Sequence, residues 1–146
     1  MEKVKIALAC DHAGYERKLG IIEYLKELGY EYKDFGAYSN ESSDYPDWVH
    51  PMAEAVSAGD YRFGITFCGS GNGINMTANK HQKIRSALCW MPEIASLARK
   101  HNDANVCALP ARFVTDEEAR EIVKVFLTTG FEGGRHLRRI QKIPVK

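Results

Sequence analysis

The chain has 146 residues, of which 45% are hydrophobic and 27% are charged, and its formal net charge is +1. This length and composition predict one soluble globular domain, residues 1–146, with an ordinary hydrophobic core. The small net charge argues against nucleic acid or a membrane surface as partner, so an anionic ligand would need a local group of positive charges. No apolar run approaches the ~20 residues of a transmembrane helix, and we expect a cytoplasmic protein.

Strands and helices are expected to alternate along the whole chain. Short apolar runs predict strands at residues 4–10, 30–35, 61–68, 85–90 and 105–109. Helical spacing predicts helices at 15–28, through 49–56, at 72–80, at 92–101, from the capping box at Thr115 to about 129, and within 133–140. Residues 36–47 are expected to form the longest loop.

Five such alternations favour a particular α/β architecture. They predict a doubly wound, Rossmann-like, three-layer α/β/α fold with a five-stranded parallel sheet, because parallel strands need right-handed helical crossovers. Ligands of such sheets bind beyond the carboxyl ends of the strands. Residues from about 131 onward are expected to form a C-terminal extension that contacts a partner subunit.

The most informative stretch is residues 63–80, FGITFCGSGNGINMTANK, in which Gly69, Gly71 and Gly73 alternate with other residues. A glycine-rich turn between a strand and a helix directs backbone amides at a ligand, so this stretch is a candidate anion cradle. The alternative is an ordinary strand–helix turn. The pattern matches neither the P-loop nor the dinucleotide fingerprint, which disfavours a nucleotide.

Two side chains in this stretch are candidates for chemistry. Cys68 ends the predicted strand, and a helix N-terminus beside it is expected to favour the reactive thiolate; alternatively the thiol is buried and inert. Ser70 is a candidate hydrogen-bond donor to an oxyanion, or simply a turn residue. The other cysteines show neither C-x-x-C nor metal-ligand spacing, so we expect no metal and no disulfide framework.

Three further groups of polar residues have both functional and structural interpretations. Asp11 and His12 follow the first strand and would bind hydroxyls or an anion, or they merely close the turn. His101 is a candidate acid or base, or a helix C-terminal cap. Arg135 and Arg139 lie four residues apart and would hold a phosphate together, or they belong to a solvated basic tail.

The motifs taken together resemble the ribose-5-phosphate isomerase type B family, which also includes galactose-6-phosphate and allose-6-phosphate isomerases. The motifs that carry the resemblance, in chain order, are ACDHAG (9–14), DYP (44–46), CGSGNG (68–73), ANK (78–80), HNDAN (101–105) and EGGRH (132–136). The resemblance implies reversible isomerisation between ribose 5-phosphate and ribulose 5-phosphate, without metal or organic cofactor. A hexose 6-phosphate as substrate, or sugar-phosphate binding without catalysis, are the alternatives.

The resemblance also implies roles for individual residues. Cys68 would be the base that moves a proton between C2 and C1, and His101 would open the sugar ring. Ser70 and the amides of Gly69, Gly71, Asn72 and Gly73 would stabilise the enediolate. The remaining expected contacts to sugar and phosphate are Asp11, His12, Tyr45, Asn102, Arg112, Arg135 and Arg139.

The sequence departs from some relatives of this family. Some carry threonine where this chain has Ser70, which preserves a hydroxyl group. Others use a glutamate later in the loop as the base, but here that region reads Asn72, Ile74 and Asn75, which leaves Cys68. Arg138 is adjacent to Arg139, so the arginine that faces the phosphate is left open.

The predicted topology separates the two main catalytic candidates. Cys68 ends a strand and lies at the carboxyl edge of the sheet, whereas His101 ends a helix and lies at the amino edge. A strand of this length separates the edges by roughly 16 Å, too far for one proton relay. We therefore expect a homodimer whose sites combine residues from both subunits, with a tetramer left open.

Overall fold

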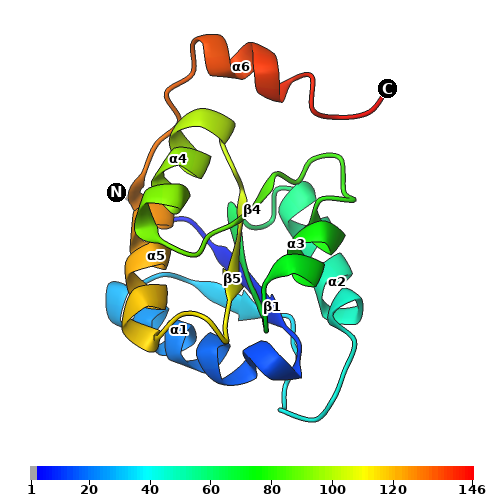
Figure 1. The fold of residues 1–146 in the computed structure, drawn as a ribbon, viewed down its shortest axis with the longest axis vertical. Helices are drawn as coiled ribbons and strands as arrows, with labels where there is room; N and C mark the ends of the chain where they lie inside the picture. Colours follow the sequence, from blue (N-terminus) through cyan, green and yellow to red (C-terminus); the bar gives the residue numbers. More distant parts are fainter. Residues whose placement is uncertain (1–2) are drawn as a thin grey trace.

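The computed structural model describes residues 3–146 and is built around one parallel sheet in the order β2-β1-β3-β5-β4 (Figure 1). The strands are β1 (Ile6–Cys10), β2 (Tyr32–Asp34), β3 (Phe63–Cys68), β4 (Ser86–Leu88) and β5 (Val106–Pro110). All neighbouring strands pair in parallel. The predicted doubly wound α/β fold is confirmed.

Helices cover both faces of this sheet and form the outer layers of the three-layer fold. They are α1 (Tyr15–Leu28), α2 (Tyr45–Ser57), α3 (Asn72–Ala78), α4 (Pro92–Asn102), α5 (Asp116–Thr128) and α6 (Arg135–Ile140), with a 3-10 turn η1 (His12–Gly14) before α1. Helices α1, α4 and α5 pack on one face, and α2 and α3 pack on the other. Helix α6 lies beyond the C-terminal end of α4 (Figure 1).

The central strands are buried on both faces, so their alternate residues enter different cores. In β1, Ile6, Leu8 and Cys10 face the α1 side, whereas Ala7 and Ala9 face α2 and α3. This explains why the strand reads as a continuous apolar run and not as an alternation of apolar and polar residues.

The structure corrects the start of the second helix. Helix α2 begins at Tyr45, whereas the sequence placed residues up to 47 in a loop. Pro46 lies in its first turn, where the fixed φ of proline suits a helix and no backbone donor is lost. Pro51 lies inside the helix, which nevertheless continues to Ser57.

A partly buried ion pair fixes the loop between β2 and α2. The ammonium group of Lys18 is fully buried and donates to the Asp34 carboxylate at 2.7 Å. It also donates to the carbonyl oxygen of Ala37. The loop therefore starts from a fixed point near the carboxyl edge of the sheet, where the polar residues gather.

Candidate active site

The glycine loop connects β3 to α3 and lies at the carboxyl edge. Gly71 has φ +80°, a left-handed conformation that favours glycine. A Cβ on Gly71 would also lie 2.4 Å from Cδ1 of Leu88. The backbone therefore needs glycine here for both conformation and space.

Tyr45 lies directly against this loop. A Cβ added to Gly73 would lie 2.4 Å from Cζ and 2.6 Å from the hydroxyl oxygen of Tyr45. The absence of a side chain at Gly73 thus allows the first residue of α2 to close over the start of α3. Tyr45, which is expected to be a wall of the pocket, therefore lies beside the glycine loop.

Asp11 and His12 join the same edge from the end of β1. The buried Asp11 carboxylate accepts hydrogen bonds from the amides of Ala13 at 2.9 Å and Gly14 at 3.1 Å. Nδ1 of His12 accepts from the amide of Ser43 at 3.2 Å. Asp11 therefore closes the turn after β1, and His12 fastens the loop before α2 to this edge.

Arg112 reaches the loop from the end of β5. Its backbone amide donates to the Gly69 carbonyl at 3.0 Å, and its guanidinium group packs on Gly69. Ser70 is exposed, and its hydroxyl accepts from the amide of Asn72 at 3.3 Å. Ser70 thus has a turn-forming role, and the Asn72 amide is already occupied.

The protonation of Cys68 differs from the sequence-based expectation. Burial raises the pKa of its thiol, since the side chain is only 5% exposed. Hydrogen bonding by the amides of Ile74, Gly71 and Gly73 lowers it, and the negative charge of Asp11 raises it further. The sequence predicted that the loop would favour the thiolate. This prediction is wrong for the net shift, because desolvation raises the pKa of the thiol by more than the amide hydrogen bonds lower it.

The other predicted residues gather at the amino edge. His101 and Asn102 end α4, and Arg135 and Arg139 lie one turn apart on α6, both exposed. Cys68 pairs in register with Pro110 at the end of β5, whereas His101 precedes Val106 at its start. The length of β5 separates these ends by roughly 13 Å. A single chain therefore holds Cys68 and His101 at opposite edges.

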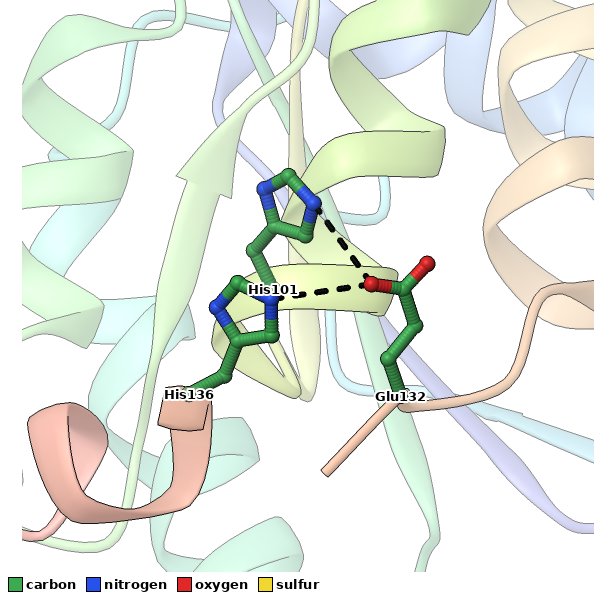
Figure 2. Close-up of side chains that lie close together, drawn as sticks. All are labelled: His101, Glu132 and His136. Atoms are coloured by element: carbon green, nitrogen blue, oxygen red, sulfur yellow. Dashed lines mark ion pairs between the residues drawn. The ribbon is translucent and has the colours of Figure 1, made fainter. Parts of the chain in front are cut away.

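Two residues beside His101 were assigned no role from the sequence. The rings of His101 and His136 stack with centroids 4.3 Å apart, and both Nε2 atoms face one carboxylate oxygen of Glu132, at 3.8 and 3.6 Å (Figure 2). Glu132 and His136 belong to the EGGRH motif, which contributes to the family resemblance. Only the folded chain shows that this motif approaches the end of α4.

A cavity of about 530 Å³ also lies at the amino edge and not at the glycine loop. Asn102, Arg85 and Ser86 line one part of it, and Ile143 and Val145 of the C-terminal tail line another. Asn102 is the only predicted contact residue in its lining. The cavity therefore does not connect Cys68 with His101 within one chain.

Comparison with known proteins identifies the family of this chain. The model of the Ribose/Galactose Isomerase family matches residues 6–143. Ribose-5-phosphate isomerase B of Escherichia coli is 44% identical over 139 residues, which are 95% of this chain and 93% of the relative. The chain belongs to the ribose/galactose isomerase family, and the resemblance seen in its motifs is confirmed.

Solved structures show the same fold. A ribose 5-phosphate isomerase from Thermotoga maritima superposes with a TM-score of 0.96 at 47% identity, covering 98% of this chain and 99% of that one. The type B enzyme from Trypanosoma brucei gives a TM-score of 0.93 at 40% identity, covering 97% of each chain. Within residues 3–146, no helix is long and apolar enough to cross a membrane.

Proposed function

We propose that this protein interconverts ribose 5-phosphate and ribulose 5-phosphate through an enediolate, with Cys68 as the base. The observation that carries the proposal is the Cys68 thiol at the end of β3, with the amides of Gly71, Gly73 and Ile74 directed at its sulfur. These groups combine a proton acceptor with donors for a developing oxyanion. Family membership supports the same reaction.

The proton transfer begins with the open-chain aldose. The Cys68 thiolate takes the C2 proton, the C–H electrons form the C1–C2 double bond, and negative charge moves to O1. Loop amides stabilise that charge. The thiol then returns its proton to C1, the proton of the O2 hydroxyl moves to O1, and C2 becomes the carbonyl carbon of the ketose.

Ribose 5-phosphate is mainly a ring, so an earlier step must open it. We assign this step to His101, which would take the proton of the C1 hydroxyl while the ring oxygen gains one. His12, Arg112, Arg135 and Arg139 would hold the phosphate, and Asp11, Tyr45 and Asn102 would contact the sugar. Positive side chains at both edges suit a substrate bound between two chains.

A homodimer would bring the two edges together. Strand β4 is an edge of the sheet, and four exposed apolar side chains lie on or near the elements that flank it: Met76, Trp90, Met91 and Leu97. Burial of these side chains against a second copy would favour association. A two-fold axis near this face would create two equivalent sites, each with Cys68 from one subunit and His101 from the other.

Steady-state kinetics test the proposed substrate. Ribose 5-phosphate should be turned over with a kcat/KM at least tenfold above that for allose 6-phosphate or galactose 6-phosphate. Preference for a hexose 6-phosphate would overturn the choice of substrate. Tight binding of all three sugars without turnover would instead identify a sugar-phosphate-binding protein.

A further inference from the structure

The side chains of His101, Glu132 and His136 form a cluster with the chemistry of a metal site. Their ligand atoms all lie within 4.8 Å of one another. Two imidazoles and one carboxylate are ligands that Zn²⁺ accepts in proteins, with a fourth position open to water. We propose that this cluster binds Zn²⁺ or a similar transition-metal ion, and that the bound ion inhibits the enzyme.

The ligand spacing that forms ion pairs with protonated histidines is also close to that of a shared metal ion. Bonds of about 2.0–2.2 Å in tetrahedral geometry place ligand atoms about 3.3–3.5 Å apart. Oε1 of Glu132 lies 3.8 Å from Nε2 of His101 and 3.6 Å from Nε2 of His136. Both separations are too long for a hydrogen bond and only a few tenths of an ångström too long for a shared cation.

His136 provides an independent observation. Its side chain is 9% exposed, and its Nε2 atom is buried without a hydrogen-bond partner among residues 3–146. An unpartnered ring nitrogen of this kind has its lone pair available to a further ligand.

The cluster needs one small rearrangement to close on an ion. The two rings are inclined by only 14°, and a metal–nitrogen bond lies in the plane of its ring, so one imidazole must turn about χ2. His101 is 39% exposed and Glu132 is 52% exposed, whereas His136 is enclosed. The buried histidine would therefore hold its place, and the two exposed ligands would turn towards the ion; Figure 2 shows the three side chains before such a change.

Occupation of the cluster would remove the function proposed for His101. A lone pair bound to Zn²⁺ cannot accept the proton of the C1 hydroxyl, so ring opening would stop. The binding rests on the cluster alone, whereas the inhibition also rests on the proposed function. Chelation of the ion should restore activity, since the reaction itself is not expected to need a metal.

Calorimetric titration of the metal-free protein with Zn²⁺ tests the binding. We expect one ion per chain, with affinity at least tenfold weaker in Glu132→Gln and His136→Gln. Glu132 is exposed, so the first variant should fold normally even if the buried His136 variant does not. His81→Gln is the matched control: His81 pairs with His50 at 2.8 Å at another exposed site, and its loss should leave the affinity unchanged.

Cobalt absorption identifies the ligands. Co²⁺ should give visible bands of a four-coordinate nitrogen and oxygen site that disappear in Glu132→Gln. A thiolate-to-cobalt band, lost in Cys68→Ala, would place the ion at the glycine loop and overturn the proposal. So would the absence of stoichiometric binding, or binding that only His81→Gln weakens.

Activity measurements separate the binding of the ion from its inhibition of the enzyme. Zn²⁺ should inhibit the wild type reversibly, and the concentration required should rise at least tenfold in Glu132→Gln. Binding without inhibition would overturn the inhibitory role and the assignment of ring opening to His101. Absence of binding would leave metal-free turnover of ribose 5-phosphate unaffected, so the proposed function would stand.

Discussion

At the scale of single residues, the role proposed for Cys68 depends on the competition between burial and backbone amides at its thiol. Burial raises the pKa of this thiol even though three amides oppose the rise. A protonated thiol cannot act as the base. As the proposed base, Cys68 would therefore react through the thiolate, the form that burial disfavours.

The raised thiol pKa predicts the pH dependence of the reaction. The active fraction is the deprotonated one, so kcat/KM should increase with pH and level off only above the ordinary thiol pKa of about 8.5. Iodoacetamide labelling of Cys68 should follow the same pH curve, and ribose 5-phosphate should protect the thiol. A plateau already reached below neutral pH would contradict the raised pKa.

His101 should affect only substrates that form a ring. The ketose ribulose 5-phosphate has its O5 bound to phosphate and cannot close to a furanose, so its C1 proton can exchange without ring opening. His101→Asn should lower turnover of ribose 5-phosphate by about 10²–10⁴-fold. It should retain exchange of the C1 proton of ribulose 5-phosphate in D₂O, as measured by NMR.

Cys68→Ala is the comparison variant for His101→Asn. Isomerisation of ribose 5-phosphate and exchange of the C1 proton of ribulose 5-phosphate should both need the base. It should lose isomerisation and exchange together. Equal loss of exchange in His101→Asn would show that His101 acts in the proton transfer itself or in the structure of the site.

At the scale of elements, close packing of the glycine loop against α2 positions the site. Gly73→Ala would push a Cβ into the Tyr45 ring and displace the loop that carries Cys68. A shift of about 1 Å can lower the rate about 10²-fold. Gly130→Ala is the matched control, because its Cβ would meet no atom within 4 Å and its φ is not left-handed.

Kinetics and a ligand-free stability measurement distinguish the effects of the glycine variants. Gly73→Ala should lose turnover while its melting temperature falls only modestly, and Gly130→Ala should match the wild type in both. Full activity in Gly73→Ala would show that the position of Tyr45 is not important for catalysis.

The loop before α2 depends on the buried ammonium group of Lys18. Lys18→Met would leave the partly exposed Asp34 carboxylate without its charged partner and should lower the free energy of unfolding by about 1–3 kcal/mol. Lys26→Met is the control, since the exposed Lys26–Glu23 pair should contribute only ~0–1 kcal/mol. Urea unfolding measures the free energy of unfolding of both variants. Equal small decreases would mean that the Lys18–Asp34 pair contributes little to stability.

The sequence predicted correctly those features that depend on residues close together in the chain. The Thr115–Glu118 capping box opens α5 as expected, because both of its hydrogen bonds are local. The start of α2 was misplaced, since polar residues typical of loops also begin helices. The net pKa of Cys68 could not be foreseen, because it depends on burial by residues distant in the sequence.

At the scale of the whole molecule, strand order and the two edges of the sheet decide where function can occur. The sequence predicted five parallel strands and placed Cys68 and His101 at opposite edges, since both follow from the alternation of strands and helices. It did not predict that Glu132 and His136 approach His101. That contact requires the path of the chain from α5 to α6 across the end of α4 (Figure 1).

The separation of the edges leads to the central proposal, that each active site is shared between two subunits. Cys68→Ala and His101→Ala should each be nearly inactive as homodimers. After subunit exchange, half of the dimers should be mixed, and each mixed dimer should contain one intact and one doubly altered site. The mixture should therefore regain about one quarter of the wild-type activity.

The decisive measurement is turnover of ribose 5-phosphate by this mixture, with subunit exchange verified by native mass spectrometry of differently tagged chains. Recovery of about a quarter of the wild-type rate, in proportion to the mixed dimers, is the predicted result. Verified exchange with no gain over the separate variants would contradict the shared site and place Cys68 and His101 in the same chain's reaction.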